Sequence, residues 1–373
     1  MNTTQRHLIM QRWNVVQHEL IPELKGQVGT LTPKLEKVIH TLEWARIEEF
    51  VTSSWQGNGR PPHDRGVLAN AFVAKAVLGL TSTTALIERL HIDRALRRIC
   101  GFAMYRQLPD AATFSRAFAE FADAKLAERV HEALIKQQLG QTLIGHISRD
   151  GTAIAAREKP AKKPTNKPTL ATTAIPTKPK RGRPCKGDER APKINVLTQQ
   201  LTQSLNQMCA ALPNICDRGT KCNAQGYKSS WNGYKLHLDT ADTGVVISAL
   251  LTSASVHDSQ TAIPLSLMSH ERVTSCYDLM DAAYCSDVIR SHCESLGHVA
   301  LIDHNPRGGE KREFDPAQAQ RYKARTQAER SNARLKDEYG ARTIYVQGPV
   351  KVMSHLMFGV LALSVDQLMR LLN

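Results

Sequence analysis

The sequence has no closely paired cysteines and no apolar segment at its start, and both absences narrow its class. Its eight cysteines form no CxxC pair, which argues against common zinc motifs and against a disulfide-stapled secreted domain. A zinc site at Cys209, Cys216, Cys222 and His237 would need spacings that fit no common pattern. The first residues, MNTTQRHLIMQRW, lack a signal-peptide core. We therefore expect a reduced cytoplasmic compartment with free thiols.

The chain also lacks an uninterrupted apolar run long enough to span a membrane. The most apolar stretch covers residues 350–365, contains Lys351 and His355, and is followed at once by Asp366. A membrane span needs about 20 predominantly apolar residues. We expect this stretch to form a buried C-terminal helix, and we expect no membrane partner.

Acidic residues are outnumbered by basic ones. The chain of 373 residues has 49 Lys and Arg against 35 Asp and Glu, a formal net charge of +14. A strongly basic chain indicates a polyanionic partner, most simply nucleic acid. A generically basic soluble protein is the alternative.

Much of the positive charge lies in one segment, residues 157–193. It holds twelve Lys and Arg, three acids and seven of the seventeen prolines. Proline-rich, charged segments with few apolar residues do not form a core, so we expect a disordered or extended insertion. Within it, Arg181-Gly182-Arg183-Pro184 has the form of an AT-hook core, in which arginines enter a narrow minor groove. A solvated basic linker that attracts phosphates is the alternative.

Before this insertion the periodicity predicts helices. From about residue 31 to residue 138 the patterns are helical, with one helix over 63–78. Candidate N-terminal caps are Thr81 or Ser82 for one later helix and Asp110 or Thr113 for another. Short helices joined by tight turns are compatible with a helix-turn-helix DNA reader. They are equally compatible with a plain helical bundle.

The rest of the chain alternates between strand and helix patterns, which indicates an α/β domain. A first apolar strand at 143–147 ends in Ser-Arg-Asp-Gly-Thr. The further expected strands are 234–238, 245–252, 276–280, 299–302 and a short one at 342–346. The expected helices are 195–212, 258–268, 287–296, one that carries Glu329, and C-terminal helices.

One predicted helix concentrates polar chemistry on a narrow stripe. Tyr322, Arg325, Glu329 and Lys336 are separated by three, four and seven residues. At about 100° per residue all four fall within an arc of roughly 60° on an α-helix. A solvated face with an ordinary ion pair four residues apart could produce the same pattern.

Three acids from separate elements supply a chemical reason for that stripe. Asp150 is predicted just past one strand, Asp281 at the end of another, and Glu329 on the stripe helix. Close carboxylates are what a two-metal phosphoryl-transfer site needs, and Mg²⁺ prefers such oxygen ligands. Asp278 is an alternative to Asp281.

At these residues the sequence resembles DDE transposases of bacterial insertion sequences. The spacing Tyr322-x2-Arg325-x3-Glu329-x6-Lys336 matches their signature at all four positions. The resemblance extends from about residue 60 to residue 372, and its other blocks are PPHDRGVLANAFVAKAVLGL, DGT, WNGYKLH, LLTSASVHDSQ, DAAY, AERSNARLKDEYG and VQGPVKVMSHLMFGVLAL.

The resemblance implies a fold and a division of the chain. We expect an α/β, ribonuclease H-like mixed-sheet catalytic domain at 141–373, which contains the basic insertion. An all-α N-terminal domain at 31–140, expected to bind DNA ends, precedes it, and residues 1–30 form an N-terminal tail.

The resemblance also implies an activity. Asp150, Asp281 and Glu329 would hold two Mg²⁺ ions, or Mn²⁺, and Tyr322, Arg325 and Lys336 would lie along the DNA backbone. The enzyme would bind the terminal inverted repeats of its own insertion sequence, cleave there, and join the 3′ ends to target DNA. Its partners would be double-stranded DNA and further copies of itself, as a homodimer or a higher assembly at the nucleoid.

Several alternatives stay open at this point. A ribonuclease H-like nuclease without strand transfer, and a non-catalytic transposase-derived DNA-binding protein, fit the same residues. Only 48 residues separate Asp281 from Glu329, too few for the large β-rich insertion of well-studied relatives, so hairpin-forming cleavage is unsupported. Asp258 and His257 could border the site, or Asp258 could cap a helix. Trp231 could stack on an extruded base or pack in the core.

Overall fold

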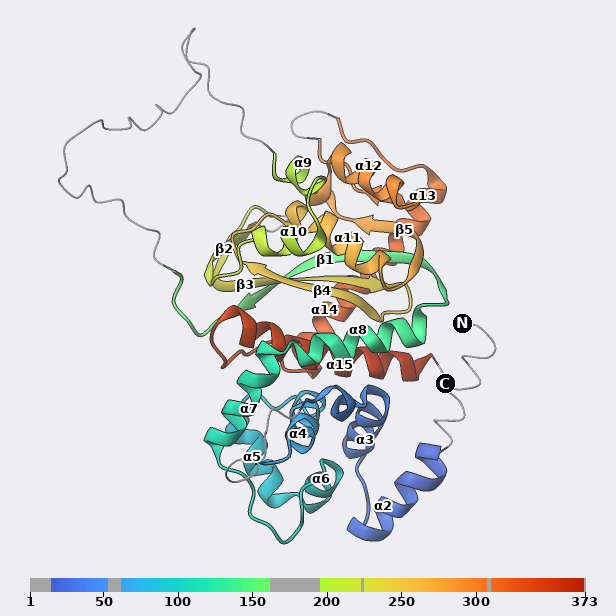
Figure 1. The fold of residues 1–373 in the computed structure, drawn as a ribbon. Helices are drawn as coiled ribbons and strands as arrows, with labels where there is room; N and C mark the ends of the chain where they lie inside the picture. The colour runs from blue at the N-terminus through green and yellow to red at the C-terminus, as the bar shows by residue number, and fades with distance from the viewer. Residues whose placement is uncertain (1–14, 53–61, 162–194, 223–224, 307–309, 372–373) are drawn as a thin grey trace, which may run out of the picture.

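The computed structural model describes residues 15–52, 62–161, 195–222, 225–306 and 310–371 (Figure 1). Most of the basic insertion, with Arg181 and Arg183, lies outside these ranges. The N-terminal part is helical, as predicted. Its elements are η1 (Val16–Leu20), α2 (Ile21–Val28), α3 (Pro33–Ala45), η2 (Ile47–Phe50), α4 (Arg65–Val77), α5 (Thr83–Ile92), α6 (Arg94–Ile99), α7 (Ala111–Asp123) and α8 (Leu126–Leu139).

The predicted caps account for where two of these helices begin. Ser82 Oγ accepts from the Ala85 amide at 3.0 Å at the start of α5, and Asp110 Oδ1 accepts from the Thr113 amide at 2.7 Å at the start of α7. Such side-chain oxygens satisfy amides that have no partner in the first helical turn. The region that the sequence predicts as a tail contains α2, whose Ile21 is buried.

The second part of the chain is built on a six-stranded mixed sheet. Its strands are β1 (Leu143–Ala155), β2 (Asp217–Cys222), β3 (Lys228–Ala241), β4 (Val246–Ser253), β5 (Thr274–Met280) and β6 (Val299–Ile302). The order is β2-β3-β1-β5-β6, and β4 also pairs with β3. β1 runs antiparallel to β3 and parallel to β5, which in turn runs parallel to β6.

The sheet corrects several sequence predictions. β1 continues through Ala155, because its polar second half pairs with β3 in an unbroken register. Asp150 therefore lies within the strand and not after it. The predicted helix at 195–212 is two short helices, α9 (Val196–Gln200) and α10 (Leu205–Ala211), because Ser204 and Gln207 form a capping box that starts the second. Residues 342–346 form no strand.

Helices cover both faces of the sheet (Figure 1). The helix α14 (Thr326–Glu338) packs on β1 and β3 on one face. On the other face lies α11 (Ala262–His270), next to α12 (Asp287–Ser295). This α/β arrangement, preceded by the helical part, confirms the predicted ribonuclease H-like fold class.

The C-terminal helix α15 (Pro349–Arg370) joins the two parts of the molecule (Figure 1). It packs against α8, α4, α7 and α3 on one side and against β4 and α14 on the other. Phe358 of α15 lies 5.9 Å from Phe72 and 6.3 Å from Phe118, ring centre to ring centre. By length and composition α15 could cross a membrane, but 78% of its most apolar window is buried inside the protein. The prediction of a buried C-terminal helix is confirmed, although one helix stands where several were expected.

Candidate active site

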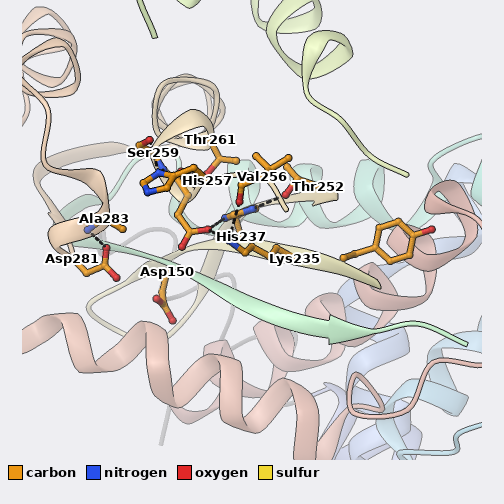
Figure 2. Close-up of polar contacts among 12 residues, drawn as sticks. Asp150, Lys235, His237, Thr252, Val256, His257, Ser259, Thr261, Asp281 and Ala283 are labelled. Carbon is orange, nitrogen blue, oxygen red and sulfur yellow. Dashed lines mark hydrogen bonds and ion pairs between the residues drawn. The ribbon is translucent and has the colours of Figure 1, made fainter. Parts of the chain in front are cut away.

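Two of the predicted acids come together where two neighbouring parallel strands meet: Asp150 lies within β1, and Asp281 directly follows β5. Ser148 of β1 pairs in register with Leu279 of β5. Asp150 follows Ser148 by two residues within β1, and Asp281 follows Leu279 by two residues, directly after β5 ends at Met280. Figure 2 shows the two carboxylates near one another at this end of the sheet.

The helix α14 lays further polar groups over the same edge. An open cleft of about 560 Å³ is lined by Asp150 and Asp281 from the sheet and by Glu329, Asn332 and Lys336 from α14. Glu329, Asn332 and Lys336 are three and four residues apart, so they share one face of the helix. The structure thus places all three predicted acids around a single cleft.

Asp150 is held in a fixed orientation at the floor of this cleft. Its Oδ2 accepts a hydrogen bond from Asn332 Nδ2 at 2.9 Å, and its Oδ1 lies 3.9 Å from the Arg325 guanidinium. The pKa of Asp150 is raised to about 6, chiefly by burial; the charge of Arg325 opposes this rise and the charge of Asp281 adds to it. Asp281 accepts from the Ala283 amide at 2.9 Å, and burial raises its pKa as well.

Glu329 is more exposed to solvent than Asp150. Its side chain is 54% exposed, and its Oε1 lies 2.6 Å from Arg325. Among the described residues no three His, Cys, Asp or Glu side chains lie close enough together to hold a metal ion. The donor set nevertheless suits a divalent cation with oxygen ligands, because three carboxylates share one cleft and two of them have raised pKa values.

The four residues of the predicted polar stripe belong to three different elements. Tyr322 ends α13 (Pro316–Tyr322), Arg325 ends a 3₁₀ turn, η5 (Lys323–Arg325), and the other two stripe residues lie on α14. The prediction of one continuous α-helix is therefore wrong, because the tighter 3₁₀ turn interrupts the α-helical hydrogen bonding. Tyr322 donates its hydroxyl hydrogen to the Met280 carbonyl at 3.0 Å, directly before Asp281.

A second polar group lies against Gly151, the residue after Asp150. Figure 2 shows Lys235 and His237 of this group. A Cβ at Gly151 would come within 2.9 Å of His237 Nδ1 and 3.4 Å of Asp258 Oδ1, so this position has no room for a side chain. Asp258 Oδ1 accepts from Lys235 Nζ at 2.8 Å. Lys235 and Asp258 line the same cleft as Asp150.

His257 and Asp258 both line the cleft, and the predicted helix cap is His257 and not Asp258. His257 caps the 3₁₀ helix η3 (Asp258–Thr261), since its Nδ1 accepts from the Ser259 amide at 3.4 Å. Asp258 is paired with Lys235 and does not cap. Asp278, the alternative second acid, is 2% exposed and hydrogen-bonded to His298 at 3.2 Å. It is absent from the cleft lining, which favours Asp281.

The β2–β3 hairpin forms a further wall of the cleft, with Lys221 and Trp231. Trp231 donates from Nε1 to the Tyr234 carbonyl at 3.0 Å and lies against Gly219, where a Cβ would approach its ring to 2.5 Å. The indole is thus fixed in place and still lines the cleft. Three cysteines that the sequence offered as zinc ligands, Cys209, Cys216 and Cys222, are free thiols.

Sequence reasoning missed three polar residues of the cleft: Asn332, Lys221 and Lys235. Asn332 could have been found, because it stands three residues after Glu329 and therefore on the same helix face. Lys221 belongs to β2, whose sequence DRGTKC has no apolar alternation to predict a strand. Lys235 lies in the WNGYKLH block, where no local pattern marks its contact with Asp258.

The raised pKa of Asp150 predicts a stability change with a definite sign. A carboxyl whose pKa is higher in the folded state than in the unfolded state stabilises the fold below its ordinary pKa, and this contribution is lost as the pH rises through about 6. We expect Asp150→Asn to remove the loss. In EDTA, the free energy of unfolding of Asp150→Asn minus that of wild type should be larger at pH 8 than at pH 4, by on the order of 2 kcal/mol. Urea unfolding at both pH values measures this, and a difference that does not change with pH would contradict the assignment.

Two family models match the chain, and both describe transposase domains. The model "Transposase domain (DUF772)" matches residues 22–120, which are the helical part. The model "Transposase DDE domain" matches residues 214–365, which include Asp281 and Glu329. Comparison with curated proteins and with solved structures finds no match.

The fold and the matched domains define a class, a DNA-directed enzyme with a ribonuclease H-like core. Within that class the chain belongs to the DDE-type transposases of the insertion-sequence kind. The family generally uses a divalent metal, and its substrate is DNA.

Proposed function

We propose that this transposase binds the ends of its own insertion sequence, cleaves the DNA there, and joins the 3′ ends to target DNA. The observation that carries the proposal is that Asp150 of β1, Asp281 directly after the neighbouring parallel strand β5, and Glu329 of α14 line one cleft. Three carboxylates at one cleft provide ligands for two Mg²⁺ or Mn²⁺ ions. When bound, such ions activate an attacking oxygen and stabilise the leaving one.

The chemistry consists of two successive displacements at phosphorus. A water oxygen attacks the phosphorus at the end of the insertion sequence, the bond from phosphorus to the 3′ oxygen breaks, and that oxygen takes up a proton. The resulting 3′-hydroxyl attacks a phosphorus of target DNA, loses its proton, and displaces a target 3′ oxygen. No bond between protein and DNA forms in either step.

The residues around the cleft have separate roles in this proposal. Asp150, Asp281 and Glu329 hold the ions, and Asn332 orients the Asp150 carboxylate. Arg325 and Lys336 neutralise and position the scissile phosphate, as guanidinium and ammonium groups do in phosphate sites. Tyr322 braces the backbone before Asp281 and lies beside the DNA.

The helical part would recognise DNA ends as a homodimer or a higher assembly at the nucleoid. Its assignment to residues 31–140 stays a proposal. DNA flanking the gene provides a direct test, because terminal inverted repeats bracketed by a short target duplication would identify the substrate. Intact flanking DNA without repeats would favour the nuclease or the non-catalytic alternative.

The basic insertion carries its own prediction. We expect Arg181→Ala with Arg183→Ala to make DNA binding less sensitive to salt. The slope of log affinity against log salt concentration should become less steep by about 0.9 for each lost phosphate contact. Binding measured between 50 and 200 mM salt gives this slope, and Lys162→Ala with Lys163→Ala is the matched control. If the segment is an AT-hook, Arg181→Ala with Arg183→Ala should lower the affinity for A·T-rich DNA more than that for G·C-rich DNA. If it is a basic linker, both variant pairs should lower DNA affinity equally. An unchanged slope for both pairs would contradict any role in DNA binding.

A further inference from the structure

A buried ion pair lies on the sheet face opposite Asp150. Arg149 immediately precedes Asp150 on β1, so its side chain points to the other face, toward α11. Arg149 is 1% exposed and its partner Asp239, on β3, is 0% exposed. Two hydrogen bonds join them, from Nε to Oδ1 and from the terminal guanidinium nitrogen to Oδ2, both at 2.7 Å.

The same guanidinium reaches the strand that carries the second acid. Its remaining terminal nitrogen lies 3.4 Å from Met280 Sδ, and Met280 immediately precedes Asp281. Arg149 thus contacts β3 and β5 from its place on β1. Arg149 and Met280, which directly precede the two candidate metal ligands Asp150 and Asp281, are therefore in contact with each other.

The pair is tied to the elements behind the sheet as well. Asp239 Oδ2 also accepts from Ser269 Oγ of α11 at 2.7 Å. Ser269 Oγ in turn lies 2.8 Å from Ser248 Oγ of β4. Three central strands, an outer strand and a helix therefore meet in one hydrogen-bonded group.

Stability alone does not explain a pair of this kind. Removing two charges from water is costly, and replacing a buried pair by apolar side chains is often neutral or stabilising. What the pair does specify is register, since Arg149 and Asp239 are direct cross-strand partners in the β1–β3 ladder. A slip of one residue would turn Asp150 away from α14 and break both hydrogen bonds.

We propose that Arg149 and Asp239 are positioning residues for the catalytic acids. By fixing β1 against β3 and against the end of β5, they fix the positions of the Asp150 and Asp281 carboxylates relative to one another. They touch neither DNA nor metal, and act only through the two acids. This inference rests on the proposed function.

The test compares variants that remove the pair in different ways. Arg149→Met with Asp239→Leu replaces it by apolar side chains, and Arg149→Lys keeps the charge but loses the two-pronged geometry. Lys75→Met is the control, because Lys75 is a buried cation of α4, at the side chain of His355 and away from the pair. Mn²⁺ binding to the free full-length protein is measured by electron paramagnetic resonance, beside the melting temperature, affinity for the DNA end, and end cleavage in MnCl₂.

We expect the apolar double variant to fold and to bind the DNA end within threefold of wild type. Its Mn²⁺ dissociation constant should rise about ten- to hundredfold, as for other residues that orient metal ligands, and cleavage should fall with it. Arg149→Lys should also raise the Mn²⁺ dissociation constant, whereas Lys75→Met should leave it unchanged.

A folded double variant with wild-type Mn²⁺ binding and cleavage would overturn the inference, and so would an equal loss in Lys75→Met. If the double variant does not fold, Arg149→Lys decides, and wild-type Mn²⁺ binding in that variant overturns the inference. Failure of the proposed function looks different: Asp150→Asn would then bind Mn²⁺ and cleave DNA like wild type.

Discussion

Replacing Glu329 by Gln is expected to lower end cleavage on the order of 10³-fold while leaving DNA-end affinity within a few-fold. The substitution keeps the size of the side chain and removes one of the three carboxylates that line the cleft. Because the side chain is 54% exposed, its loss of charge should cost little stability. The measurement is single-turnover cleavage of a duplex that carries the terminal repeat, with Mg²⁺ or Mn²⁺.

The same helix provides a matched control. Glu338 of α14 pairs with Arg334 four residues earlier, just as Glu329 pairs with Arg325, but Glu338 is not part of the cleft lining. Glu338→Gln should therefore cleave like wild type. Full cleavage by Glu329→Gln would remove Glu329 from the site, and equal losses in both variants would point to the helix rather than to the carboxylate.

Replacing Arg325 by Ala is expected to change metal binding and cleavage in opposite directions. The guanidinium lies 2.6 Å from Glu329 and 3.9 Å from Asp150, where it competes with a cation for the same carboxylates. Without it, Mn²⁺ should bind the DNA-free protein about tenfold more tightly. Cleavage should nevertheless fall about a hundredfold, because the scissile phosphate loses its guanidinium.

These two effects are measured separately, by Mn²⁺ paramagnetic resonance without DNA and by single-turnover cleavage at saturating metal. Arg334→Ala on the same helix should leave both unchanged, although it should lower stability, because Arg334 bonds Gln367 and Asp366 of α15. Weaker Mn²⁺ binding in Arg325→Ala would contradict the proposed competition. Unchanged cleavage would contradict the phosphate contact.

Much of the fold follows from local pattern, and the exceptions depend on distant partners. The apolar strands β4, β5 and β6 and the capped helices α5 and α7 were predictable from periodicity and cap residues. The polar half of β1 and all of β2 were not, since both become strands by pairing with β3. Conversely, Ile344 lies in a segment with strand composition, but it is buried without a partner strand.

The candidate site, too, was predictable only in part, because some of its contacts join residues far apart in the sequence. Sequence spacing and family resemblance selected Asp150, Asp281 and Glu329, and the structure gathers them at one cleft, but their role in catalysis stays a prediction. The Arg149–Asp239 pair joins residues 90 positions apart, and no local pattern in one sequence connects them. The 3₁₀ turn that ends at Arg325 was not predictable either, because the residues around it have ordinary helix propensities.

The most direct test of the central claim is a strand-transfer assay with the full-length protein. A duplex that carries the terminal repeat with an exposed 3′-hydroxyl is incubated with plasmid target and Mg²⁺, and covalently joined products are counted. We predict joined products for wild type and none for Asp281→Asn. Cleavage without joining would identify a nuclease, and joining by Asp281→Asn would contradict the proposed catalytic site.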